Sequence, residues 1–251
     1  MSTRARINQD FVSEKSYDTQ TLAIIPVRGG SQDIAFKLLS ETNLLELKLQ
    51  KVLQSKNVEK VVVTSTDLEI QNLLRTFGFD DKVEFHHRKR SEARHNQNLN
   101  LTVEEIATQQ AEAGVQFVIM AILTLEYPFL EPYKIDDVIN TMLVFGSDSI
   151  IGVRSENSVF YQHHGDGLHP ILDRDKYTKL EREALFKQVG GISAVDKDIF
   201  LAKNEVVTGN VGHVIIDQLS SMGLFTKMDW EIAELISQKS LNITDIEISK
   251  S

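Results

Sequence analysis

The sequence contains no cysteine among its 251 residues, which excludes disulfides, thiolate metal sites and thiol nucleophiles. It has only 4 prolines and 13 glycines, too few for collagen-like or low-complexity segments. No apolar run approaches the roughly 20 residues of a membrane-spanning helix, and residues 1–8 hold no apolar core of signal-peptide length. We therefore expect a globular protein that does not engage a membrane and is cytoplasmic.

Positive charge is scarce: 27 basic residues face 36 acidic ones, for a formal net charge of −9. This balance argues against nucleic-acid binding, which needs a basic face. A protein of this charge that handles phosphates must concentrate its cations locally. Two places do so, Arg28 with Lys37 and the basic run at residues 86–90.

An apolar run at residues 22–27 leads directly into Arg28, Gly29, Gly30 and Ser31, which we call the glycine loop. Adjacent glycines allow positive φ angles and bring bare N–H groups close to a ligand. Arginine suits a phosphate, because its planar guanidinium can donate two hydrogen bonds at once. The pattern predicts an anion-binding loop at the carboxyl end of a first strand, where open α/β sheets bind ligands.

Apolar strand patterns alternate with amphipathic helical patterns along most of the chain. The alternation predicts an α/β fold in three layers, with a mainly parallel, doubly wound sheet. Thr66 with Glu69 predicts a capping box, and Asp229 is the expected N-cap of the last helix. The expected strands are 22–27, 61–64, 83–86, 117–123 and 149–153, and the expected helices are 43–55, 67–77, 99–113 and 135–145.

One domain of residues 20–240 is expected, between a flexible tail at 1–19 and an extension at 241–251. Residues 157–187, called the arm below, are rich in histidine, glycine and charge, and break the alternation. We expect the arm to leave the sheet as a hairpin plus a helix. The apolar core returns at residues 188–195 and 212–217.

Four ordered segments resemble the acylneuraminate cytidylyltransferases, the synthetases of CMP-sialic acid and related sugars. They are IIPVRGGS at 24–31, VVVTSTD at 61–67, GSDSIIGV at 146–153 and DWEIAE at 229–234. The resemblance spans residues 21–236 and implies a nucleotide-diphospho-sugar transferase-like fold. It also implies that the arm joins two copies into a homodimer.

The resemblance implies that CTP is coupled to a nonulosonic, sialic-type sugar acid, releasing pyrophosphate with Mg²⁺ as cofactor. Arg28 and Lys37 would be catalytic, because attack at the α-phosphorus builds negative charge that fixed cations stabilise. Gly190 would contact the sugar substrate. The nucleotide would be bound by Arg28, Gly29, Gly30, Ser31, Gln32, Arg88 and Thr124.

Several positions depart from the family pattern. Gln32 stands where the family has a lysine, and Thr124 replaces a glutamine. The family's metal-binding pair of aspartates falls on Gly223 and Phe225, neither of which offers the side-chain oxygen that a hard cation prefers. Asp217 is the nearby carboxylate that could serve as a metal ligand instead.

Three functional interpretations stay open. The first is an active synthetase of a CMP-activated sugar acid, and the second is a catalytically impaired paralogue that binds nucleotide or a partner without turnover. The third is a nucleotidyltransferase for another base or sugar. A dehydrogenase is disfavoured because no G-x-G-x-x-G follows the first strand. The pairs at 86–87 and 163–164 are poor metal chelators, since neighbours on a strand point to opposite faces.

Overall fold

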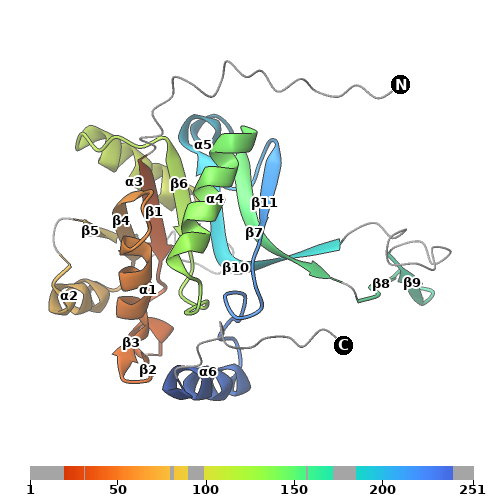
Figure 1. Cartoon of the computed structure of the whole chain (residues 1–251). Coiled ribbons are helices and arrows are strands. Elements are labelled where there is room, and N and C mark those ends of the chain that lie inside the picture. The colour runs from red at the N-terminus through yellow and green to blue at the C-terminus, as the bar shows by residue number, and fades with distance from the viewer. Residues whose placement is uncertain are drawn as a thin grey trace.

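A computed structural model of the protein describes residues 20–30, 32–79, 82–89, 99–156, 158–171 and 185–239. It has a seven-stranded central sheet in the order β11-β7-β10-β6-β1-β4-β5, flanked by helices (Figure 1). β10 runs antiparallel to both of its neighbours, and the other strand pairs are parallel. The predicted fold class is therefore confirmed. The strands are β1 Thr21–Pro26, β4 Val58–Ser65, β5 Val83–His87, β6 Ile119–Leu123, β7 Ser149–Glu156, β10 Leu185–Asp196 and β11 Val211–Ile215.

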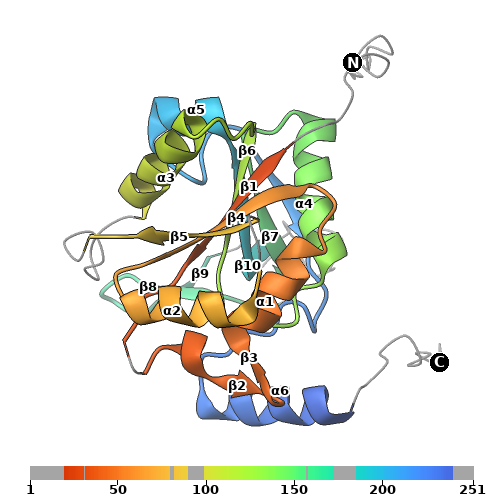
Figure 2. The same cartoon turned by 90° about the vertical axis from the view of Figure 1, so that its left-hand side faces the viewer.

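Helices cover both faces of the sheet, as Figure 2 shows from the side. Ala23 and Ile25 of β1 pack in a cluster with α1, α2 and α4, whereas Leu22 and Ile24 pack with α3 and α5. Successive strand residues point to opposite faces, so this double cover explains the unbroken apolar run of β1. The helices are α1 Leu44–Leu53, α2 Leu68–Phe77, α3 Asn100–Glu112, α4 Pro132–Phe145, α5 Lys197–Lys203 and α6 Lys227–Lys239, with a 3₁₀ turn η2 at Ile34–Phe36.

Two predicted helix caps are wrong by a few residues. The N-cap of α2 is Asp67, whose carboxylate accepts from the Glu69 amide at 2.9 Å, so Thr66 does not cap it. Helix α6 begins before Asp229, and Thr226 precedes it. The Thr226 hydroxyl accepts from the Asp229 amide, and the Asp229 carboxylate accepts from the Thr226 amide at 2.7 Å. Asp229 is thus the returning member of a capping box.

The arm begins as a ribbon that continues β7 and β10 beyond the sheet (Figure 1). Leu185 pairs with Glu156 and Gln188 with Val153, in antiparallel register. The expected hairpin is present as β8 Tyr161–His163 and β9 Leu168–Pro170. No helix occurs among the arm's described residues, and residues 172–184 lie outside the described residues, as do the tail at 1–19 and the extension at 241–251.

A short hairpin, β2 Leu38–Leu39 and β3 Thr42–Asn43, lies against α6 (Figure 2). The amide of Ser40 in its turn donates to both carboxylate oxygens of Glu234, at 3.1 and 3.2 Å. No helix in the described part of the chain is long and apolar enough to cross a membrane.

Candidate functional site

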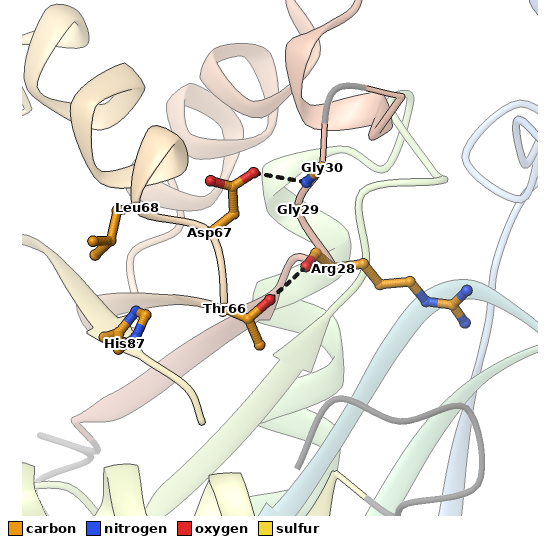
Figure 3. Close-up of a pocket in the computed structure, with 7 residues that line it drawn as sticks. All are labelled: Arg28, Gly29, Gly30, Thr66, Asp67, Leu68 and His87. Carbon is orange, nitrogen blue, oxygen red and sulfur yellow. Dashed lines mark hydrogen bonds between the residues drawn. The ribbon is translucent and has the colours of Figure 1, made fainter. Parts of the chain in front are cut away.

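A pocket of about 670 Å³ lies at the carboxyl edge of the sheet, where β1, β4 and β5 end side by side. Parallel strands bring the residues that follow each of them to one edge. Ser65 of β4 pairs with His87 of β5, which fixes the second wall of the pocket. The lining residues, drawn in Figure 3, are Arg28, Gly29, Gly30, Thr66, Asp67, Leu68 and His87.

The described part of the glycine loop is held by two carboxylates of the chain itself. The Gly29 amide donates to Asp33 at 2.8 Å, and the Gly30 amide donates to Asp67 at 2.7 Å. Both glycines have positive φ angles, 81° and 95°. A Cβ on Gly29 would overlap the side chains of Asp67 and Ser65, so only glycine fits there. The loop is therefore closed tightly against the end of β4.

Arg28 is the exposed cation of this loop. Its carbonyl oxygen accepts from the Thr66 hydroxyl at 3.3 Å, so its main chain is tied to the end of β4. Its side chain points away from Asp67 and His87 (Figure 3). Strand order places β6 on the other side of β1 from β4. The guanidinium is thus directed away from the wall of the pocket that Asp67 and His87 form.

Sequence reasoning named the glycine loop but missed the opposite wall of the pocket. Thr66, Asp67, Leu68 and His87 line it, although none was predicted to bind a ligand. The signal was available, because β4 and β5 were expected strands and their carboxyl ends belong at the same edge as the end of β1. His86 and His87 do point to opposite faces: His86 is buried against Thr64, and His87 lines the pocket.

Arg88, predicted to bind nucleotide, is only 6% exposed. Its Nη2 donates to the carbonyl oxygen of Val27 at 3.1 Å, and its amide donates to that of Ser65 at 2.8 Å. Arg88 therefore fastens the ends of β1, β4 and β5 together beneath the glycine loop. It is not among the residues that line the pocket, and its contact with nucleotide stays a prediction.

Thr124 and Gly190, predicted for nucleotide and sugar, lie in one neighbourhood at the end of β6. The Thr124 amide donates to the carbonyl oxygen of Gly191 at 2.9 Å. A Cβ on Gly191, whose φ is 55°, would overlap Thr124 Oγ1 and the Tyr127 ring, whereas one on Gly190 would press on Ile216. Gly190 and Gly191 lie where the register between β10 and β7 shifts, between Gln188 and Ser193. Gly191 thus lets β10 and the β6–α4 loop approach closely, and Gly190 makes room for Ile216.

Lys37 and Gln32, both exposed, follow the glycine loop, whereas Ser31 lies outside the described residues. Lys37 Nζ sits 5.1 Å from the centroid of the Trp230 ring, an arrangement that attracts a cation to the π face. Two residues of the segment 229–234 therefore hold the chain that follows the glycine loop: Trp230 holds Lys37, and Glu234 holds the β2–β3 turn.

Asp217, the candidate metal ligand, lies just after β11 and accepts from the Ser220 amide at 2.9 Å. Partial burial acts to raise the pKa of Asp217, but the hydrogen bonds from Ser220 and the charge of Lys134 outweigh it and hold this pKa below its usual value. Phe225 packs edge-on against Tyr127, with the ring centroids 5.8 Å apart. Within the described ranges no group of three or more His, Asp or Glu side chains could hold a metal. The role of Asp217 as a metal ligand stays a prediction.

The fold belongs to the nucleotidyltransferase-like class of α/β folds, as similar solved structures show. The chain is similar to 4-diphosphocytidyl-2C-methyl-D-erythritol synthase from Anaerococcus prevotii, with 14% identity and a TM-score of 0.63 over 88% of this chain and 97% of that one. It is similar also to CMP:2-keto-3-deoxy-manno-octonic acid synthetase complexed with CTP, with 14% identity and a TM-score of 0.63 over 89% of this chain and all of that one.

Residues 22–186 match the profile of the Cytidylyltransferase family. The chain therefore belongs to the cytidylyltransferases. No curated protein sequence matches it significantly. The predicted family is confirmed at this level, whereas the acylneuraminate subgroup, the cytoplasmic location and the homodimer stay predictions.

Proposed function

We propose that the protein transfers the cytidylyl group of CTP to a nonulosonic, sialic-type sugar acid. The observation that carries this proposal is the pocket at the carboxyl edge, which is lined by Gly29, Gly30 and the exposed Arg28. A hydroxyl oxygen of the sugar would form a bond to the α-phosphorus as the bond to pyrophosphate breaks. The hydroxyl proton leaves to solvent, and pyrophosphate is released.

In this reaction Arg28 would bind phosphate oxygens of CTP and stabilise the charge that develops on them. Lys37, held by the Trp230 ring, is the second cation near the loop in sequence. Mg²⁺ belongs to the proposal as the cofactor that neutralises the phosphates of CTP, with Asp217 as the candidate protein ligand.

The choice of sugar acid is supported by the four sequence segments that resemble the acylneuraminate subgroup. The similar structures are named for other acceptors, a keto-deoxy-octonic acid in one case and 2C-methyl-D-erythritol in the others. These names share the cytidine nucleotide and differ in the acceptor. CTP is therefore the better supported half of the proposal.

The test is pyrophosphate release from CTP and Mg²⁺ with a panel of acceptors: sialic, legionaminic, pseudaminic and keto-deoxy-octonic acids, and phosphorylated 2C-methyl-D-erythritol. We expect turnover with a nine-carbon sugar acid. Arg28→Ala should lower kcat/KM by about 100-fold or more, while Arg75→Ala, exposed at the end of α2, should match the wild type. Absence of turnover with every acceptor would contradict the proposal.

A second candidate function is nucleotide binding without turnover. It is favoured by Phe225, which packs on Tyr127 in one of the positions where the resemblance implies a metal carboxylate. This candidate predicts CTP binding that calorimetry finds weak and indifferent to Mg²⁺. Tight binding that requires Mg²⁺ would reject it in favour of the active enzyme.

The proposal includes a homodimer formed through the arm. Its described part exposes several large apolar side chains, which a second copy of the chain could cover. They are Val159, Phe160, Tyr161, Leu168, Ile171 and Phe186.

A further inference from the structure

The glycine loop offers an anion two successive amides, and in this structure both donate to carboxylates of the same chain. Gly29 donates to Asp33 Oδ2 at 2.8 Å, and Gly30 donates to Asp67 Oδ2 at 2.7 Å. A backbone N–H directed at one carboxylate oxygen cannot also bind a phosphate oxygen well. The nearest ligands of these amides are therefore internal anions.

The two carboxylates are anchored differently. Asp67 follows β4, and its backbone amide donates to Ser65 Oγ at 3.1 Å. Its carboxylate caps the ten-residue helix α2 by accepting from the Glu69 amide. Moving it would uncap that helix and disturb the wall of the pocket. Asp67 is thus a fixed part of the frame.

Asp33 is held only by local contacts among its described neighbours. Its Oδ1 accepts from the Ala35 amide at 2.8 Å and so caps the three-residue turn η2. The Oδ2 atom reaches Gly29, so a turn of the Asp33 side chain would release the Gly29 amide and would cost only the cap of a three-residue turn. The residue before it, Gln32, is uncharged and offsets none of its negative charge.

We propose that Asp33 is an internal competitor for substrate phosphate: its carboxylate occupies the Gly29 amide and leaves it when a polyphosphate enters the glycine loop. The proposal rests on the proposed nucleotide function of this pocket. Asp33 thereby sets the affinity of the loop, because every bound polyphosphate must displace it or lie beside its charge. Cytidine without phosphates does not meet Asp33, and its binding is independent of it.

The test compares Asp33→Ala and Asp33→Asn with the wild type, using calorimetry with CTP, UTP, ATP, CMP, cytidine and tripolyphosphate. Removing a charge-assisted bond to the loop amide should tighten tripolyphosphate and CTP binding about tenfold or more in Asp33→Ala. Asp33→Asn keeps an oxygen for the Ala35 amide but loses the charge, so an intermediate gain is expected. Cytidine affinity should not change.

Asp196→Ala is the matched control. Asp196 also caps a short helix, accepting from the Asp198 and Ile199 amides, but it pairs with Ile119 at the opposite edge of the sheet. It should lower thermal stability as Asp33→Ala does and leave tripolyphosphate affinity unchanged. In the wild type, the NMR signal of the Gly29 amide should move on adding tripolyphosphate.

Unchanged or weaker tripolyphosphate binding in both Asp33 variants would overturn the proposal, as would an equal gain in Asp196→Ala. A gain for tripolyphosphate with no preference for CTP over other nucleotides would support the competition by Asp33 and contradict the cytidylyl function. No binding of any polyphosphate to any variant would overturn both.

Discussion

Lys48 lies on α1 with only 1% of its surface exposed. Its ammonium donates to the carbonyl oxygen of Tyr127 at 3.2 Å, in the loop that joins β6 to α4. Burial, assisted by the nearby charge of Lys51 and opposed by Glu126, lowers the pKa of Lys48 from its ordinary 10.5 to about 7. The folded protein therefore prefers this amine neutral.

The sign of the effect on stability follows from proton linkage. Below about pH 7 the amine is protonated in both the folded and the unfolded protein. Burial of the charged amine then lowers the free energy of unfolding by its largest amount. Above this pH the folded state releases the proton first, so stability rises with pH until the unfolded amine also titrates near 10.5. The shift corresponds to about 5 kcal/mol in total, of which about 2 kcal/mol falls between pH 7 and 9.

The perturbation is Lys48→Met, which keeps the length of the side chain and removes the titrating group. Urea unfolding at pH 7 and 9 gives the free energy of unfolding for each protein. The difference between wild type and Lys48→Met should change by about 2 kcal/mol over this interval, in the direction that favours the wild type at high pH. Lys56→Met, at an exposed site, should follow the wild type. Parallel pH profiles for wild type and Lys48→Met would refute the reasoning.

Two further predictions concern packing around the site. Gly191→Ala should lower the free energy of unfolding by about 2 kcal/mol or more, because its φ is positive and the new Cβ overlaps Thr124. Gly78 has a similar φ but open space around it, so Gly78→Ala should lose only the stability that the positive φ costs. Equal losses for the two variants in urea unfolding would argue against the overlap. In a double-mutant cycle, Lys37→Met and Trp230→Leu should couple by about 0.5–1 kcal/mol of stability, and strict additivity would show that the ring does not hold the ammonium.

Much of the sheet could be predicted because its inner strands are buried on both faces and therefore read as unbroken apolar runs. β1 and β6 are the clearest cases. In β1, Leu22 and Ile24 face one set of helices, and Ala23 and Ile25 face the other. The short β2–β3 hairpin was not expected, since two-residue strands carry no periodicity. The start of α2 was shifted because Thr66 and Asp67 are adjacent and either residue type can cap a helix. The start of α6 was shifted because Thr226 and Asp229, three residues apart, hydrogen-bond to each other's amides.

The candidate site was predicted only where residues follow one another in sequence. The glycine loop could be named for that reason, but its bond to Asp67 joins residues 37 positions apart. Arg88 shows a second limit. A basic run usually faces solvent, yet strand alternation directs this guanidinium inward to the Val27 carbonyl oxygen. Sequence alone could not foresee which member of the run is buried.

The ribbon formed by the ends of β7 and β10 determines where this chain can gain or lose residues. Glu156 and Leu185 are partners in the antiparallel register, so the segment between them leaves and re-enters the frame at adjacent points. The distance between the two ends of this segment is fixed by the pairing of Glu156 with Leu185, and the pairing of the other strands does not depend on the segment's length. Doubling the length of such a connection costs only about 0.6 kcal/mol. Insertions, deletions or a grafted sequence between Glu156 and Leu185 should therefore leave the register of the sheet and the glycine loop intact.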